Sequence, residues 1–138
     1  MVAAIREGWR RGFRCFHIYG GTGGRLDHTL ANIQCLADIA QRGGRGFLFD
    51  SDTVITAITN SSIRFPASAK GMVSVLCHSE TAVDVNENGL KYSLVNATLS
   101  NSYPLGVSNE FTGVPSEISV EKGTLIIMSP IGIKEESI

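Results

Sequence analysis

Residues 13–28, FRCFHIYGGTGGRLDH, join two hydrophobic patterns through a loop rich in glycine. Before the loop, residues 13–19 are aromatic and β-branched with little polar alternation, which predicts a strand covered on both faces. After it, apolar residues recur at helical spacing, which predicts a helix over residues 27–41 that ends at Gly43 and Gly44. Strand, glycine-rich loop and helix in this order are typical of an open α/β sheet, where ligands bind at the carboxyl ends of strands.

The elements predicted outside this unit change from mixed α and β before Ser62 to all-β after it. Residues 2–11 predict a helix, because Ile5 and Trp9 share one helical face, and residues 46–49 and 54–58 predict strands. From Ser62 onward, turn residues recur about every eight to twelve positions between short apolar runs, which is typical of a β-sandwich. The predicted strands there are residues 72–78, 82–85, 91–94, 98–100, 111–112, 117–120 and 124–128, with hairpins at Asn88-Gly89 and Lys122-Gly123.

We therefore predict two units with different folds. Residues 1–60 form a partial open α/β sheet, of the order strand, loop, helix, strand. Residues 61–138 form an antiparallel β-sandwich.

Composition excludes several classes of protein. The chain has 138 residues, 43% of them hydrophobic, and a net charge of −1, which fits neither a disordered tail nor a dedicated nucleic-acid binder. No apolar run approaches the roughly 20 residues that cross a bilayer, and the basic start lacks the apolar part of a signal peptide. We expect a cytoplasmic protein with neither nucleic acid nor membrane as partner. Its three widely spaced cysteines predict neither disulfides nor a zinc site.

Charge and glycine are concentrated together near the amino terminus. Residues 1–46 hold seven arginines against three acids, a net charge of +4, whereas the rest of the chain carries −5. Nine of the fifteen glycines also lie in residues 1–46. Because glycine lets a ligand approach the backbone closely, this combination suits an anion such as a phosphate.

The glycine-rich loop has the groups for phosphate chemistry. Backbone N–H groups at a helix start attract anions, and the planar guanidinium of Arg25 matches phosphate oxygens. Asp27 has a carboxylate that can hold Mg²⁺ or accept a proton from a hydroxyl. Neither the dinucleotide fingerprint nor the P-loop fits this segment. An alternative is that Asp27 caps the helix and the glycines form only a tight turn.

Two neighbouring features are interpreted as structural. His28 follows Asp27 at the predicted helix start, where a histidine is more often a local hydrogen-bond partner than a catalyst. Asp50 and Asp52 flank a serine after a predicted strand and resemble a metal site, but we interpret them as part of a turn.

Taken together, the motifs resemble those of thiamine pyrophosphokinase. The loop sequence GGRLDH at residues 23–28, with Asn32 one turn into the helix, is similar to that family's signature. Three later segments are similar to its thiamine-binding β-domain in order and spacing: GLKYSL at 89–94, GVSNE at 106–110 and GTLI at 123–126. The joint match spans roughly residues 17 to 128. The resemblance implies that residues 1–60 are the remnant of an α/β catalytic domain and that residues 61–138 are a thiamine-binding β-sandwich domain.

The resemblance implies transfer of a pyrophosphoryl group from ATP to the hydroxyl of thiamine, giving thiamine diphosphate and AMP with Mg²⁺ required. It implies catalytic roles for Arg25 and Asp27, the latter holding Mg²⁺ or the hydroxyl. It also implies that phosphate binds to Gly23, Gly24 and Arg25. The pyrimidine ring of thiamine would bind to Ser108 and Asn109, with Tyr92 packed nearby.

The chain departs from the family in one respect. Its members have a longer amino-terminal region with acidic residues that bind Mg²⁺ and nucleotide, so we expect a carboxyl-terminal portion with little or no kinase activity alone. The resemblance also implies a homodimer, with thiamine bound between the β-domain of one subunit and the α/β domain of the other.

Two alternatives remain open at this point. The chain can be a stand-alone module that binds thiamine or a related pyrimidine without catalysis. It can also be a structural β-sandwich that binds another protein, in which case the glycine loop is only a turn.

Overall fold

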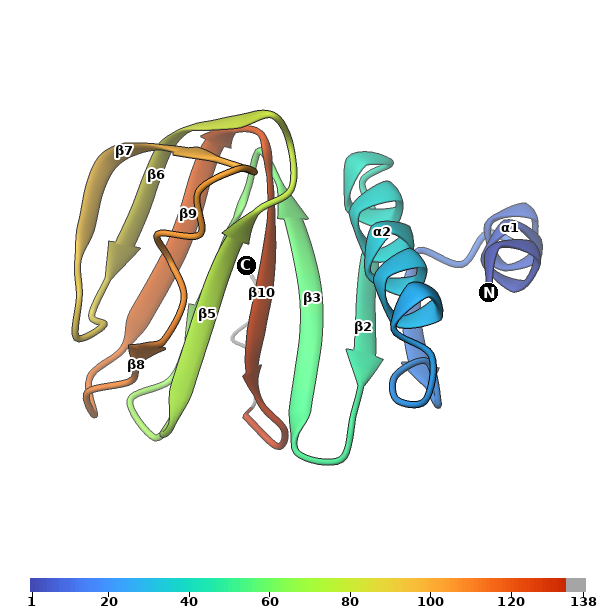
Figure 1. Cartoon of the computed structure of the whole chain (residues 1–138), viewed down its shortest axis with the longest axis horizontal. Helices are drawn as coiled ribbons and strands as arrows, with labels where there is room; N and C mark the ends of the chain where they lie inside the picture. Colours follow the sequence, from blue (N-terminus) through green and yellow to red (C-terminus); the bar gives the residue numbers. More distant parts are fainter. Residues whose placement is uncertain (134–138) are drawn as a thin grey trace.

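The computed structural model describes residues 1–133, which form two sheets and two helices (Figure 1). The helices are α1 (Val2–Arg10) and α2 (Leu26–Gln41). The strands are β1 (Cys15–Tyr19), β2 (Arg45–Phe49), β3 (Thr53–Thr59), β4 (Ser62–Phe65), β5 (Met72–Cys77), β6 (Thr81–Asn88), β7 (Leu94–Ser100), β8 (Asn109–Glu110), β9 (Ser116–Lys122) and β10 (Thr124–Pro130). One sheet has the order β1-β2-β3-β10-β5-β8 and the other β4-β9-β6-β7. The predicted fold, an α/β piece with a β-sandwich, is confirmed.

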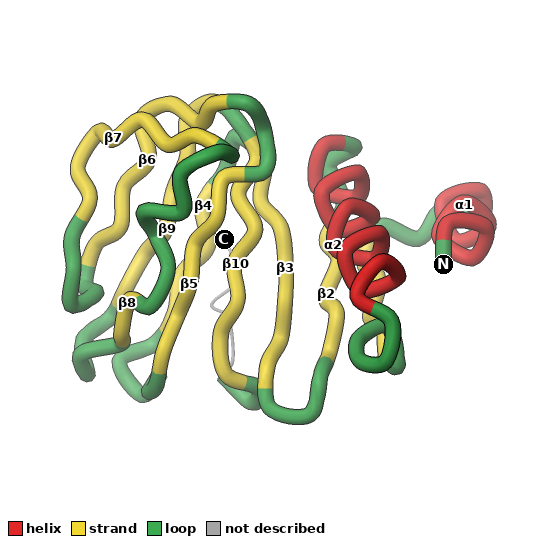
Figure 2. The backbone as a smooth tube through the Cα atoms, viewed as in Figure 1, coloured by secondary structure: helices red, strands yellow, loops and turns green. Residues whose placement is uncertain are grey.

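Both helices lie at the β1–β2 end of the six-stranded sheet (Figure 2). The buried stripe of α2, which includes Leu36 and Ile39, packs against Leu48 of β2 and Ile126 of β10. Burying each such side chain contributes about 1.5–3 kcal/mol, so this face holds the helix on the sheet. α2 therefore begins where β1 ends, with the glycine loop between them.

The sandwich forms where the four-stranded sheet covers the other half of the six-stranded one. Val75 and Ile127 from the larger sheet and Val85 and Ile118 from the smaller are fully buried between them. Along β6 and β9 such residues alternate with polar ones, as expected of two packed sheets, whereas β10 is also covered on its other face, where Ile126 packs with α2.

Two of the turns that carry the chain from one sheet to the other, at Asn60 and at Gly123, are hydrogen-bonded to each other. The predicted hairpin at Lys122-Gly123 is wrong, because β9 and β10 belong to different sheets and Gly123, at φ 129°, makes a crossing instead. Asn60 braces this crossing: its side-chain Oδ1 accepts a hydrogen bond from the Gly123 N–H at 2.8 Å. The boundary that we predicted between residues 60 and 61 falls here, while β3 pairs with both β2 and β10. Strands from both predicted units, β3 before this boundary and β10 after it, thus share one sheet.

Three further predictions about strands need correction. Residues 91–93 are not a strand, and β7 begins only at Leu94, because the side chain of Asn109 binds the backbone of Tyr92 in place of a strand partner. β4 was not predicted. β1 is covered on one face only: Ile18 is buried, but Tyr19 is 70% exposed and stacks on Phe49, with ring centroids 4.7 Å apart. The described helices pack only on the Ile18 side.

Neither of the described helices is long and apolar enough to cross a membrane.

Candidate functional site

The glycine loop turns sharply between β1 and α2. Gly23 and Gly24 have φ of 81° and 66°, in the left-handed region that favours glycine, and nothing lies within 4 Å of where a Cβ would be. Glycine is therefore needed here for backbone conformation, and the loop is open to a ligand. The Asn32 amide donates to the Gly21 carbonyl at 2.8 Å, and the Thr22 hydroxyl donates to Asp50 at 2.8 Å. These bonds anchor the loop to α2 and to the turn after β2.

Asp50 and Asp52 do belong to a turn, as interpreted from the sequence. The carboxylate of Asp50 accepts the Thr22 hydroxyl, and that of Asp52 accepts the Thr53 hydroxyl at 2.8 Å. Among residues 1–133, moreover, no three His, Cys, Asp or Glu side chains gather closely enough to hold a metal ion.

The helix start is open as well. Arg25 is the N-cap of α2, and no side chain caps it, so the alternative with Asp27 as the cap is wrong. The Asp27 carboxylate instead accepts the His28 backbone N–H at 2.9 Å. The first-turn N–H groups that Asp27 does not bond, together with the positive end of the dipole of this 16-residue helix, attract an anion.

Arg25 and Asp27 form a two-pronged ion pair in solvent. The distances are 2.6 Å from Nη2 to Oδ2 and 3.2 Å from Nε to Oδ1, and the side chains are 71% and 64% exposed. The Arg25 guanidinium holds the pKa of Asp27 below its usual range, so the carboxylate is ionised at neutral pH and is a weak base. It is better suited to orient a hydroxyl or a cation than to remove a proton. Because an exposed pair contributes little free energy, Arg25 can turn toward a phosphate at small cost.

The second predicted group, Ser108 and Asn109, lies at the far edge of the six-stranded sheet. The segment before β8 runs along β5, and the Val75 N–H donates to the Gly106 carbonyl at 2.8 Å. Ser108 has a φ of 64°, which is strained for a residue with a Cβ, and its N–H donates to the hydroxyl of Ser74 at 3.1 Å. Ser108 is exposed, and its own hydroxyl binds nothing among the described residues.

Asn109 lies beneath this surface, only 4% exposed. Its Oδ1 accepts the backbone N–H groups of Tyr92 and Glu110, each at 2.9 Å, and its Nδ2 donates to the Tyr92 carbonyl and to Glu87, each at 2.7 Å. An amide has two donors and two acceptor sites, so all four are in use. A direct contact of Asn109 with thiamine stays a prediction, whereas its hold on the backbone of Tyr92 is observed.

Glu87 was not singled out from the sequence. It lies on β6 with 1% of its surface exposed, and burial raises its pKa, an effect that the hydrogen bond from Asn109 partly opposes. The sequence contained a signal for it. Val85 and Glu87 are two positions apart and therefore face the same side of a strand, and an acid at such an inward-facing position is unusual.

The two predicted groups are far apart within one chain. β1 and β8 are the opposite edges of the six-stranded sheet, five strand intervals apart, which is about 24 Å at ordinary strand spacing. One thiamine molecule therefore cannot touch Arg25 and Ser108 of the same chain.

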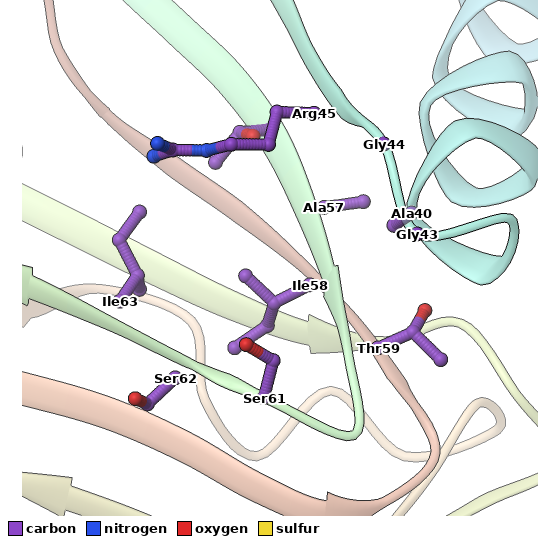
Figure 3. Close-up of a pocket in the computed structure, with 11 residues that line it drawn as sticks. Ala40, Gly43, Gly44, Arg45, Ala57, Ile58, Thr59, Ser61, Ser62 and Ile63 are labelled. Carbon is purple, nitrogen blue, oxygen red and sulfur yellow. The ribbon is translucent and has the colours of Figure 1, made fainter. Parts of the chain in front are cut away.

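A third place on the molecule is hollow but lacks these residues. Figure 3 shows a cavity of about 230 Å³ in which Arg45 extends over β3 toward Ile63. It lies at the start of β2 and the end of α2, away from the glycine loop, and none of the predicted site residues lines it.

Comparisons with known proteins agree with the sequence resemblance. Residues 60–125 match the family described as thiamin pyrophosphokinase, vitamin B1 binding domain. The chain is 30% identical over 112 residues to the thiamine pyrophosphokinase of Bacillus subtilis (strain 168), covering 80% of this chain and 52% of that protein. It thus spans about half the length of this curated relative.

Solved structures extend the similarity to almost the whole chain. The thiamine pyrophosphokinase structure from Bacillus subtilis superposes with a TM-score of 0.84 at 27% identity, covering 93% of this chain and 61% of that one. The structure from Geobacillus thermodenitrificans gives 0.79 at 28% identity, covering 93% and 59%. The resemblance that we inferred from the motifs is confirmed.

Proposed function

We propose, on the premise that this chain is related to the thiamine pyrophosphokinases, that it is the thiamine-binding portion of an enzyme that makes thiamine diphosphate. The observation that carries the proposal is the surface around Ser108. There a free hydroxyl stands on a strained backbone fixed by the buried Asn109, within the residues that match a vitamin B1 binding domain. The exposed hydroxyl of Ser108 and the exposed ring of Tyr92, whose backbone Asn109 holds, suit a flat heterocycle with ring nitrogens.

In the proposed reaction, the hydroxyl oxygen of thiamine attacks the β-phosphorus of ATP. The bond from that phosphorus to the oxygen bridging to the α-phosphate breaks, AMP leaves with the bridging oxygen, and the hydroxyl proton passes to solvent or phosphate. Such a transfer needs positioning and charge stabilisation more than covalent catalysis. A cytoplasmic location is part of the proposal, because the reaction consumes ATP.

The glycine loop is proposed to hold the phosphates. Gly23 and Gly24 leave the backbone accessible, the uncapped α2 start attracts the anion, and Arg25 neutralises charge. The ionised Asp27 would hold Mg²⁺ or orient the thiamine hydroxyl. One carboxylate suffices, because Mg²⁺ bound to ATP is held chiefly by phosphate oxygens and water. Bound there, Mg²⁺ would neutralise developing charge on the phosphates.

Two copies of the chain are proposed to form each site. The glycine loop and Ser108 lie at opposite edges of one sheet, so the loop of one copy must meet Ser108 of another. A homodimer with two equivalent sites satisfies this requirement with a single kind of contact.

The first experiment is a calorimetric titration of thiamine into the purified chain. We expect binding that Ser108→Ala weakens about tenfold, as for loss of a hydrogen bond to a buried ligand group. Ser68→Ala, which changes an exposed turn serine, is the control. Absence of binding to the folded dimer would contradict the proposal.

A second experiment measures AMP formation from ATP and thiamine by the same preparation. Thiamine-dependent AMP supports the full reaction in this chain. Tight thiamine binding without any nucleotide binding would instead support the stand-alone binding module.

A further inference from the structure

One carboxyl group is buried between the two sheets and forms no ion pair within residues 1–133. Glu87 projects from β6 of the four-stranded sheet, and its Oε2 accepts a hydrogen bond from Asn109 of β8 in the six-stranded sheet at 2.7 Å. Its other oxygen, Oε1, is buried with no hydrogen-bond partner among the described residues. Glu87 thus makes a polar link between the sheets at the edge where Ser108 lies.

This link acts together with the backbone groups of Tyr92 and Glu110 to determine which way the Asn109 amide faces. The Glu87 oxygen that it contacts is an acceptor, so the NH₂ group of Asn109 must face Glu87, and its oxygen must face the opposite way. There the oxygen accepts the N–H groups of Tyr92 and Glu110, each at 2.9 Å. A flipped amide would set oxygen against oxygen at Glu87 and N–H against N–H at Tyr92 and Glu110.

The orientation matters because Asn109 joins the two segments at the proposed thiamine site. It clamps both backbone groups of Tyr92, and it directly follows Ser108, whose positive φ needs support from its surroundings. The hydroxyl of Ser74 supports Ser108 from the other side, at 3.1 Å.

We propose that Glu87 is a positioning residue that orients Asn109 and thereby aligns Tyr92 and Ser108 for the ligand. The positioning itself rests on observed contacts, while its link to thiamine rests on the proposed function. Stability alone is a poor reason for this carboxyl, because an unpaired oxygen in the interior is unfavourable and an apolar side chain would avoid that penalty.

The test compares Glu87→Gln with Glu87→Leu in the full chain, by amide hydrogen exchange and by thiamine titration. Glutamine retains an oxygen that accepts the Asn109 N–H, so we expect exchange and affinity within about twofold of the original protein. Leucine keeps the volume but removes the acceptor. We expect exchange at the Tyr92 and Glu110 amides to accelerate about tenfold beyond any change at Ile126 in the sheet interior, and thiamine affinity to fall about tenfold.

Two further variants keep the test decisive. Glu87→Asp shortens the side chain by one methylene and withdraws the oxygen from Asn109; it replaces the leucine variant if that does not fold, with the same result expected. Val85→Ala, on the same strand and the same buried face, is the matched control. It should accelerate exchange generally, without selecting Tyr92 and Glu110.

Each outcome bears on the proposal. Unchanged exchange at the Tyr92 and Glu110 amides in the leucine and aspartate variants would overturn it. Exchange that accelerates equally at all amides, as expected for Val85→Ala, would overturn it as well. Selective acceleration together with no thiamine binding by the original chain would support the positioning role and contradict the proposed function instead.

Discussion

At the β1 edge the loop of residues 20–25 leaves Arg25 and Asp27 in solvent, whereas at the β8 edge the groups around Asn109 are buried and bonded to one another. The exposed pair adds little stability and can exchange its partner for a ligand. The buried network has no spare donor, and it holds the backbone that presents Ser108. The loop that we propose for phosphate is thus adaptable, while the surface that we propose for thiamine is held in place before a ligand arrives.

The largest expected effect comes from disrupting the buried hydrogen-bond network of Asn109. Asn109→Ala leaves the Glu87 carboxyl and the Tyr92 and Glu110 N–H groups without partners. We expect the free energy of unfolding to fall by about 3 kcal/mol, measured by urea titration. Asn101→Ala, at an exposed position, should stay within about 0.5 kcal/mol of the original chain. Equal effects of the two substitutions would show that the network carries no stability.

Arg25→Ala tests the exposed Arg25–Asp27 pair, and we expect it to change ligand affinity and not stability. We expect the affinity for ATP, measured by calorimetry with Mg²⁺ present, to fall about tenfold through loss of a charge-assisted contact with phosphate. The urea midpoint should not change. Arg42→Ala is a matched control, because Arg42 pairs with Asp38 in an exposed ion pair at the other end of α2. If both variants lose the same affinity, the loop has no specific role.

The smallest expected effect is the dependence of stability on pH that arises from the buried Glu87 and not from the exposed Arg25–Asp27 pair. Burial raises the pKa of Glu87, so the folded chain holds this proton more tightly than the unfolded chain. Its contribution to stability therefore decreases as pH rises from the unfolded value, about 4.3, through the raised folded pKa. Urea midpoints across this range should fall more steeply for the original chain than for Glu87→Gln. Parallel curves would mean that Glu87 does not titrate differently on folding.

Local sequence determined much of this protein. The spacing of Ile33, Leu36 and Ala40 correctly predicted a helix. The residues before Gly20, the glycines after Tyr19 and the regular turns after Ser62 correctly predicted a strand, an open loop and a sandwich. These patterns depend on residues close in the chain. The exposed Arg25 and Asp27 were recognisable for the same reason: loop, ion pair and helix start lie within a few residues of one another.

Tertiary structure alone decided the rest. Whether Gly123 closes a hairpin or crosses between sheets depends on which distant strands pair with β9 and β10. The contact of Asn109 with Glu87 joins two sheets across 22 positions of the chain, and no local pattern encodes it. Nor did any pattern show that Arg25 and Ser108 lie at opposite edges of one sheet. Those distances follow from strand order, which long-range packing selects and sequence periodicity does not record.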